Sequence, residues 1–385
     1  MRFPEFQGEW EKYKLGDYGK VVTGNTPPTK DIKNYENGTY LWASPADLGT
    51  IKLISETKTM LSAKGFSKTR ALPKGSVLVT CIGSTIGKTG MATKEMSTNQ
   101  QINSIVVNDN NDNEFVYYAI QSAFPRYLSS IAVQAVPIIS KSSFELLPNQ
   151  RPCLQEQKKI GKFLSLLDER IATQSKIIED LKKLKSAIID YAINSLDTDF
   201  AKFGSLYEMA GEGGTPTTSN ASFYDNGKIP FIKIDDLKQK YLTENKDFIT
   251  ELGLQKSSAW LVPTHSILFS NGATIGEISI TTYPVCTKQG ILGIVPKQNI
   301  DVEFLYYFMS SSYFKKAVSR IVTEGTMKTA YLKDINNILC PIPTKEKQQE
   351  IAKMPSALNS KIDFEQSILK LFCSQKQYLL RQMFI

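Results

Sequence analysis

Two segments of the chain repeat apolar residues at the spacing of a heptad, with charged residues between them. The first runs from Leu154 to Ser195 without a proline and predicts one long helix with a coiled-coil seam. The second repeats the pattern near the end of the chain, but Pro355 stands where Leu164 stands in the first. We expect the second helix to start or kink at Pro355, because proline lacks the N–H that a helix needs. The seam residues are Ile160, Leu164, Leu167, Ile171, Ile178, Leu181 and Ile188 in the first segment, and Ile351, Leu358, Ile362, Leu369, Phe372 and Leu379 in the second.

The segments that precede these helices have a different pattern, with many Gly, Pro and Thr residues and short runs of β-branched residues. Such runs between turn residues predict short strands. Each segment also contains an aromatic stretch, beginning at Phe115 and at Phe304, that predicts a short helix. The predicted fold is therefore mixed α/β (α+β). The predicted strands are 77–80, 104–107, 266–269 and 293–295.

The second half of the chain repeats the motifs of the first half in the same order. Matching residues are separated by about 188 to 191 positions. The stretch 35–38 (YENG) matches 224–227 (YDNG), and 83–87 (GSTIG) matches 272–276 (GATIG). Two similar helices in one chain most simply bury their seams against each other, and the second must return the chain. We therefore predict two similar globular domains separated by an antiparallel coiled coil, with an internal pseudo-two-fold repeat. The expected boundaries are 1–150, 151–198 (first helix), 199–342 and 343–385 (second helix).

Charge and composition narrow the class of protein. The 385 residues carry a net charge of +8, which fits a polyanionic partner. The segment 197–342, however, has 14 basic and 15 acidic side chains, so any nucleic-acid contact must use local patches. Five cysteines lie far apart without a CxxC pair, and there is a single histidine, which makes a zinc site improbable. The cysteine pattern, with no secretion signal and no apolar run long enough for a membrane helix, predicts a cytoplasmic protein.

Several motifs suggest catalysis, but the sequence argues against each of them. The run from Gly83 to Thr89 resembles a P-loop but has three residues between its glycines instead of four. At the matching place Glu277 replaces the lysine, so we interpret the run as a tight turn between strands. His265 follows Pro263 and precedes a strand, which favours a turn histidine over a catalyst. We find no glycine-rich loop for S-adenosylmethionine, which argues against a bifunctional methyltransferase.

Candidate DNA-contacting residues are cationic or amide side chains in the two globules. Each is equally well explained as a solvated surface residue, and the amides also as supports of their own loops. We match Gln100, Gln101 and Asn103 with Lys288, Gln289 and Ile291 in the second copy. The candidates are Lys64, Lys68, Arg70, Lys88, Gln100 and Gln101 in the first globule, and Lys288, Gln289, Lys315, Lys316, Arg320 and Lys328 in the second.

The order globule–helix–globule–helix resembles the specificity (S) subunit of type I restriction–modification systems over essentially the whole chain. The first helix opens with 152–160 (PCLQEQKKI), similar to the Pro-x-x-x-Glu-Gln-x-x-Ile opening of that family, and continues to Leu167-Asp168. The second helix departs from the pattern, with Lys347 at the Glu position and Asn359 at the Asp position.

The resemblance implies a non-catalytic subunit with no cofactor of its own. Each globule would be a target-recognition domain that reads one half of a split, asymmetric site on double-stranded DNA, and the helices would fix the unread spacer. A helix of about 40 residues spans about 60 Å, on the order of 18 base pairs. Two methyltransferase (M) subunits would dock and methylate adenine N6 with S-adenosylmethionine. Two restriction (R) subunits would add cleavage that depends on ATP and Mg. The alternative is a solitary structural or regulatory DNA-binding adaptor outside any active modification enzyme.

Overall fold

The computed structural model describes residues 1–49, 51–130, 137–272, 274–322 and 328–384. Its contacts divide the chain into two compact units, Met1–Gln174 with Ile368–Ile385, and Ser175–Ser367. Each unit therefore contains one globule together with a segment of each long helix. The predicted division at residues 150, 198 and 342 stays a prediction.

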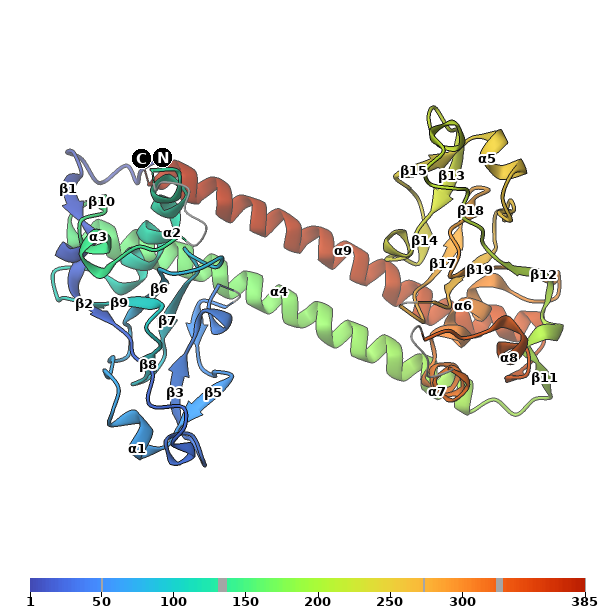
Figure 1. Ribbon diagram of the computed structural model, residues 1–385, viewed down its shortest axis with the longest axis horizontal. Helices are drawn as coiled ribbons and strands as arrows, with labels where there is room; N and C mark the ends of the chain where they lie inside the picture. Colours follow the sequence, from blue (N-terminus) through green and yellow to red (C-terminus); the bar gives the residue numbers. More distant parts are fainter. Residues whose placement is uncertain (50, 131–136, 273, 323–327, 385) are drawn as a thin grey trace. The chain divides into compact units, whose positions relative to one another are not determined.

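The first unit contains two sheets and a two-stranded ribbon (Figure 1). The five-stranded sheet has the order β2-β9-β6-β7-β4, the three-stranded sheet has the order β5-β3-β8, and β1 pairs with β10 in the ribbon. The strands are β1 (Glu11–Lys14), β2 (Gly19–Thr23), β3 (Tyr40–Ala43), β4 (Leu53–Ile54), β5 (Thr59–Leu61), β6 (Val77–Thr80), β7 (Thr89–Ala92), β8 (Ser97–Thr98), β9 (Ile102–Val107) and β10 (Pro148–Arg151).

The central strand β6 has no polar face, because it lies between two hydrophobic cores. Side chains alternate across a strand, so Val77 and Val79 enter the core beneath helix α2, while Leu78 enters the core between the two sheets. The continuous apolar run that predicted this strand is thus the signature of burial on both faces.

The helices of the first unit lie mainly against the five-stranded sheet. Asp112 accepts a hydrogen bond from the Phe115 backbone N–H (2.9 Å) and caps α2. The aromatic stretch at Phe115 is therefore helical as predicted, but the helix has 18 residues and is longer than expected. The short elements are α1 (Ala63–Phe66), α3 (Lys141–Glu145) and the 3-10 turns η1 (Leu15–Tyr18), η2 (Ile32–Asn34) and η3 (Pro45–Asp47), and the longer helix is α2 (Asn113–Ser130).

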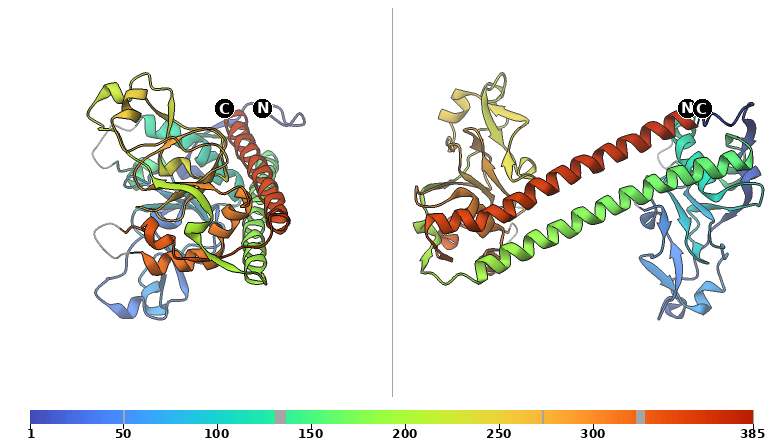
Figure 2. Two further views of the ribbon diagram at one scale, coloured as in Figure 1. Left: turned by 90° about the vertical axis from the view of Figure 1, so that its right-hand side faces the viewer. Right: turned by 180° about the vertical axis from the view of Figure 1, so that it is seen from behind.

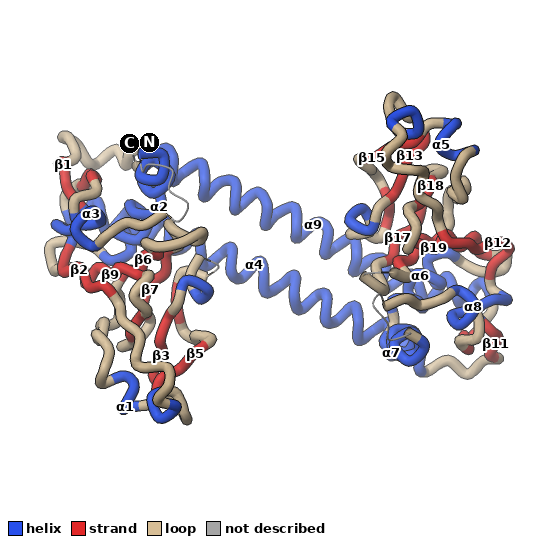
Figure 3. The backbone as a smooth tube through the Cα atoms, viewed as in Figure 1, coloured by secondary structure: helices blue, strands red, loops and turns tan. Residues whose placement is uncertain are grey.

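The second unit repeats the same topology strand for strand (Figure 3). Its sheets have the orders β12-β19-β16-β17-β14 and β15-β13-β18, and β11 pairs with β20. The strands are β11 (Phe200–Lys202), β12 (Tyr207–Glu212), β13 (Ile229–Ile232), β14 (Tyr241–Leu242), β15 (Asp247–Ile249), β16 (Ile267–Ser270), β17 (Ile278–Thr281), β18 (Cys286–Thr287), β19 (Ile291–Pro296) and β20 (Leu339–Pro341).

The helical part of the second globule is divided where that of the first is continuous. Ser311 ends one helix and caps the next, because its Oγ accepts from the Phe314 N–H (3.2 Å). The aromatic stretch at Phe304 is thus a short helix, as predicted. The elements are α5 (Glu251–Gln255), α6 (Val302–Ser310), α7 (Ser312–Ile321), α8 (Leu332–Ile335), η4 (Phe203–Ser205), η5 (Ala221–Phe223) and η6 (Ile234–Asp236).

The two long helices are α4 (Leu154–Asn194) and α9 (Lys345–Met383). Within each unit their segments lie side by side and run antiparallel (Figure 2). In the first unit Asp168 pairs with Lys376 and Arg170 lies over the Phe372 ring, so the numbering rises along one helix as it falls along the other. All thirteen predicted seam residues are buried or half-buried. The predicted mixed fold with repeated domains and antiparallel long helices is confirmed.

The expectation that the second helix starts at Pro355 is wrong. The helix begins at Lys345 and continues through the proline. Contacts to the globule on both sides of Pro355 compensate for its missing N–H. Ala352 is buried in the core of the second unit, and the Ser356 hydroxyl accepts a hydrogen bond from the Lys240 ammonium (3.0 Å).

Candidate nucleic-acid interface

In the first unit, loop 24–28, turn 98–101 and turn 81–88 meet where strands of the two sheets end. We call this region, with its counterpart in the second unit, the loop edge. Asn25 joins the loop to segment 64–70, because its Oδ1 accepts from the Arg70 N–H (3.0 Å) and its Nδ2 donates to the Lys68 carbonyl (2.8 Å). Gly24 allows the close approach of the turn, since a Cβ there would lie 2.2 Å from the Asn99 carbonyl oxygen. The structure thus brings Lys64, Lys68, Arg70 and Gln100 together.

The cations at this edge are exposed but already have intramolecular partners. Lys64 and Lys68 both contact the Asp31 carboxylate, at 2.8 and 3.3 Å. The hydrogen bond from Lys64, with the smaller contribution of Lys68, lowers the pKa of Asp31 below its usual value. Arg70 donates to the Thr23 carbonyl (2.7 Å). A phosphate could bind these side chains only by competing with neighbours that already hold them.

The two predicted glutamines differ in their availability. Gln100 is exposed and hydrogen-bonds the Thr26 hydroxyl. Gln101 is half-buried, and its side-chain carbonyl accepts from the Asn99 Nδ2 (3.0 Å). Gln100 is therefore the more accessible of the two, while Gln101 also supports its own turn.

Lys88 lies on the turn between β6 and β7, and its aliphatic stem covers Gly49. Gly83 and Gly87 in this turn have φ values of +94° and +92°. Strand β7 follows the turn directly, whereas the phosphate loop of a P-loop leads into a helix. The predicted tight turn between strands is confirmed. In the matching run of the second copy, Ala273 lies outside the described residues.

The loop edge of the second unit has the same framework with different side chains. The Gln289 N–H donates to the Thr215 hydroxyl (3.3 Å), and the Gly290 N–H donates to Glu212 (2.9 Å). Lys288 and Gln289 are exposed. Asn271 bridges this turn to the segment that carries Lys328, because its N–H donates to the Gly290 carbonyl and its carbonyl accepts from the Ala330 N–H.

The structure corrects the pairing of these residues between the copies. Thr98 is the strand partner of Ala43 in the first unit, and Thr287 is the partner of Ile232 in the second. These equivalent pairs fix an offset of 189 at this point, so Gln100 corresponds to Gln289 and not to Lys288. The sequence match was one residue out, although 98–102 (TNQQI) and 287–291 (TKQGI) share Thr, Gln and Ile at the offset of 189.

The remaining predicted cations, Lys315, Lys316 and Arg320, do not join the loop edge. They are exposed on helix α7, whose first backbone N–H, from Ser312, donates to Asp190 of α4 (2.7 Å). The charge of Lys315 also contributes, after burial, to lowering the pKa of Lys185 on α4. Helix α7 therefore starts beside the long helix, and Lys315 lies close enough to Lys185 to act on its charge.

His265 lies in a turn, as the sequence predicted, and three of the five cysteines are buried. His265 lies in a turn at φ +57°, where the first copy has Gly75 at +85°. Burial raises the pKa of the Cys286 thiol to about 11 and also raises those of Cys81 and Cys340. Among the described residues there is no group of His, Cys, Asp and Glu that could hold a metal ion, and no helix long and apolar enough to cross a membrane.

A buried lysine fastens each globule to its long helix. In the first unit Lys52 Nζ lies 2.7 Å from the Glu114 carboxylate and 2.8 Å from the Ser165 hydroxyl of α4. In the second unit Lys240 Nζ lies 2.6 Å from Glu303 and 3.0 Å from Ser356 of α9. The two clusters occupy equivalent positions of the repeat, so both junctions use the same contact. We call them the lysine locks.

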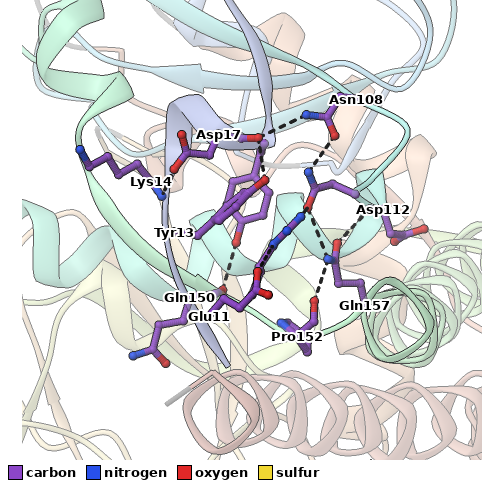
Figure 4. A network of polar contacts seen from close by, with 12 residues as sticks. Glu11, Tyr13, Lys14, Asp17, Asn108, Asp112, Gln150, Pro152 and Gln157 are labelled. Carbon is purple, nitrogen blue, oxygen red and sulfur yellow. Dashed lines mark hydrogen bonds and ion pairs between the residues drawn. The ribbon is translucent and has the colours of Figure 1, made fainter. Parts of the chain in front are cut away.

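A buried glutamine forms a second junction at the start of each long helix. Gln157 accepts from the Asp112 N–H (3.0 Å) and donates to the Pro152 carbonyl (3.0 Å) (Figure 4). Gln348 accepts from the Asp301 N–H (2.8 Å) and donates to the Pro343 carbonyl (2.9 Å). The glutamine of the Glu-Gln motif thus fixes the angle at which the chain enters the helix in both units.

The glutamate of that motif, Glu156, is not retained in the second copy, and its surroundings differ between the two units. Glu156 is fully buried and receives two hydrogen bonds from Arg2, both 2.7 Å long. Its counterpart Lys347 is exposed and pairs with Glu350 of the same helix (2.9 Å). In the first unit the charged side chain at this position is buried and binds Arg2 of the N-terminal segment. In the second unit it is exposed at the surface.

The aspartate of the Leu167-Asp168 pair is also replaced in the second unit, where Asn359 stands at the matching position. Asp168 accepts from the Tyr118 hydroxyl (2.5 Å) and pairs with Lys376 of α9 (2.6 Å). In the second unit Lys185 donates instead to the neutral side chain of Asn359 (2.8 Å). Burial without a direct anionic partner lowers the pKa of Lys185.

The long helices also carry a second apolar stripe that our sequence analysis missed. Its members are 40–77% exposed, so the stripe is not part of the seam. Their spacing of seven residues was readable in the sequence, but we assigned each helix a single apolar face. The stripe consists of one row on each helix, Ile177, Leu184 and Tyr191 on α4, and Phe364, Leu371 and Tyr378 on α9. Leu371 and Tyr378 belong to the first unit and the other four residues to the second.

A family profile described as "Type I restriction modification DNA specificity domain" matches residues 7–183 and 197–371. The chain belongs to this family of DNA specificity domains. It is 26% identical to the Methanocaldococcus jannaschii type I restriction enzyme MjaIX specificity subunit, over 92% of this chain and 88% of that protein. It is 24% identical to the Escherichia coli EcoR124I/EcoR124II specificity subunit over half of each chain.

Solved structures of this family share the fold. The S subunit of a type I restriction-modification system from Mycoplasma genitalium matches with a TM-score of 0.59 at 18% identity, covering 98% of this chain and 96% of that one. A chain from a structural study of complex assembly and conformational transition of the type I R-M system gives a TM-score of 0.61 at 16% identity, covering 96% of each chain. At these identities the likeness establishes the fold alone.

Proposed function

We propose that this type I specificity subunit reads a bipartite, asymmetric site on double-stranded DNA, with one half-site for each unit. The observation that carries the proposal is that the two units have the same topology but different side chains at the loop edge. Gln100, Lys68 and Arg70 stand at this edge in the first unit, and Gln289 with Lys288 in the second. Amide and cationic side chains are the groups that read base edges and bind phosphates, so a changed set on a constant framework gives a different half-site.

We propose further that α4 and α9 fix the unread gap between the half-sites. Both helices contribute a segment to each unit, and the lysine locks and the two glutamines fasten them to the globules. An insertion of four residues after Gln174, matched by four after Glu365, lengthens both helices by about one turn. The methylated motif should keep both half-sites and change only its gap. Replacing four residues in place is the control, and a change in either half-site would contradict the proposal.

The exposed stripe supports a scaffolding role for the helices. Exposed apolar residues at heptad spacing are typical of surfaces that bind partner helices. We propose that two methyltransferase subunits dock here and that two restriction subunits complete the complex in the cytoplasm. Under this proposal the chain performs no chemistry and holds no cofactor, while its partners hold S-adenosylmethionine, ATP and Mg.

The docking proposal is tested with charges placed on the stripe. Leu184→Glu and Leu371→Glu should reduce co-purification with the methyltransferase subunit, and folding should be retained because both side chains are exposed. Ser186→Glu, at an exposed polar position of the same helix, is the matched control. Unchanged co-purification of both leucine variants would favour the solitary adaptor.

A further inference from the structure

The chain segment before the first globule lies across the start of α4. Arg2 binds the buried carboxylate of Glu156, and the Phe3 ring meets Phe163 edge-on at 6.0 Å. Lys159 pairs with Glu5, and its ammonium lies 4.5 Å from the centre of the Phe3 ring. The first unit therefore holds a segment with the order basic, aromatic, proline, acidic. The segment turns at Pro4 and Glu5, where the Phe6 N–H donates to the Phe3 carbonyl (3.1 Å).

The equivalent place in the second unit is an open groove of about 590 Å³. Its floor is apolar and includes Ile188, Ile351 and Met354, and Tyr191 stands beside it with 77% of its surface exposed. The connection that precedes the globule here is shorter. Residues 1–10 precede β1, whereas residues 195–199 alone separate α4 from β11. The short connection lines the groove and leaves it open.

The charges that flank the two places are reversed. The helix opening of the first unit has Glu156 and Lys159, and the matching positions of the second have Lys347 and Glu350. In the open groove these two exposed side chains pair with each other at 2.9 Å. Met354 takes the place of Phe163, so an apolar contact is available at the same point. The second groove thus keeps the shape and the apolar anchor but requires the opposite charges.

We propose that this groove binds a segment of a partner protein that makes the same kind of turn and has reversed charges. The segment carries an acidic side chain, then a large apolar one, then any residue, then a basic one. The acidic group binds Lys347, the apolar group packs on Met354, and the basic group binds Glu350. The chain's own segment does not fit, because Arg2 would face Lys347 and Glu5 would face Glu350.

The test measures binding of two labelled peptides to the full chain by fluorescence anisotropy. One peptide has the sequence of residues 1–8, and the other carries Arg2→Glu and Glu5→Lys. The reversed peptide should bind about tenfold more tightly, since two exposed ion pairs change from repulsive to attractive. The double variant Lys347→Glu, Glu350→Lys keeps its own surface pair and should invert the preference.

The matched control reverses another exposed pair on the long helices of the same unit. Glu179 and Lys183 of α4 lie 2.5 Å apart, and exchanging them should leave both affinities unchanged. Binding of neither peptide, equal binding of both, or a preference that the double variant leaves intact would overturn the proposal. Tighter binding of the unchanged peptide would assign the groove to a second copy of this chain and would overturn it as well.

Discussion

The two units solve one structural problem with partly different chemistry. Both fasten a globule to a long helix through a buried lysine, and both set the start of that helix with a buried glutamine. They differ in the charged groups around these contacts. The first unit has Asp168 with Lys376 where the second has Asn359 with Lys185. The comparison teaches that the lysine locks and glutamines define the shared junction, whereas the surrounding charges have diverged.

The largest effect is expected from removing the lysine of either lock. Lys240→Met leaves the Glu303 carboxylate without its closest cation, in a site where the lysine side chain is only 2% exposed. We expect a loss of about 2–4 kcal/mol in the free energy of unfolding, because an unpaired, partly buried charge remains. Lys52→Met should cost a similar or slightly smaller amount, since that lysine is 9% exposed.

Urea unfolding measures both variants, and Lys256→Met provides an exposed control that should change stability by less than about 0.5 kcal/mol. A large effect in one unit with none in the other would show that the lock is not a shared feature.

The next largest effect on stability is expected in the first unit only. Arg2→Met leaves the fully buried Glu156 unpaired and should cost about 1–3 kcal/mol. Lys347→Met at the equivalent position removes only an exposed pair and should cost about 0–0.5 kcal/mol. Equal effects, measured by the same unfolding assay, would contradict the different burial of these two positions.

The seam charges can be exchanged between the units. Asp168→Asn removes the partner of Lys376 and weakens the contact of Tyr118, and we expect a loss of about 1–2 kcal/mol. Asn359 also donates to the Asp363 carboxylate (3.0 Å), so the two residues are exchanged together. Asn359→Asp with Asp363→Asn keeps a hydrogen bond between them, gives Lys185 a direct counter-charge and should add about 0.5–1 kcal/mol at neutral pH.

The pH dependence of the free energy of unfolding tests whether Lys185 is the source of that gain. Burial lowers the pKa of Lys185 below its usual 10.5, so its charged form reduces stability at neutral pH. This cost is relieved as the pH rises from the lowered pKa toward 10.5, because the unfolded chain then binds the proton more tightly. In the double variant Asn359→Asp, Asp363→Asn the new carboxylate raises the pKa of Lys185, and the gain should disappear as the pH increases through the raised pKa. A gain independent of pH would mean that Lys185 is not its source.

The smallest effects concern DNA reading. Gln100→Ala and Gln289→Ala should each weaken specific binding by about 1 kcal/mol, through the half-site of their own unit only. Binding is measured against probes in which one half-site at a time is scrambled. Ser84→Ala, at an exposed position of the neighbouring turn, is the control in the first unit. A loss that persists when that glutamine's own half-site is scrambled would contradict separate reading by the two units.

The repeat made most of the fold predictable, because each weak motif occurs twice in the same order. The doubly buried strand β6 and the helix from Leu154 could be predicted from apolar spacing alone. The continuation of α9 through Pro355 could not, since it depends on contacts of Ser356 with a lysine far away in sequence. The exposed stripe could have been predicted from its spacing of seven residues, but our sequence analysis missed it.

The candidate site was less predictable than the fold. Cationic residues are common on any surface, and composition does not distinguish the loop edge from helix α7. Lys315 was therefore grouped with Lys288, although the structure places them on different surfaces. The strand register pairs Gln100 with Gln289, and the Thr, Gln and Ile shared by 98–102 (TNQQI) and 287–291 (TKQGI) already indicated this pairing in the sequence.

The most direct test of the proposed function is modified-base sequencing of the source genome with this gene intact and with it deleted. The account predicts N6-methyladenine at one bipartite motif, present with the gene and absent without it. That motif would give both half-sites and the gap between them. Methylation at such a motif that is unchanged by the deletion would contradict the role of this chain as the subunit that selects the site.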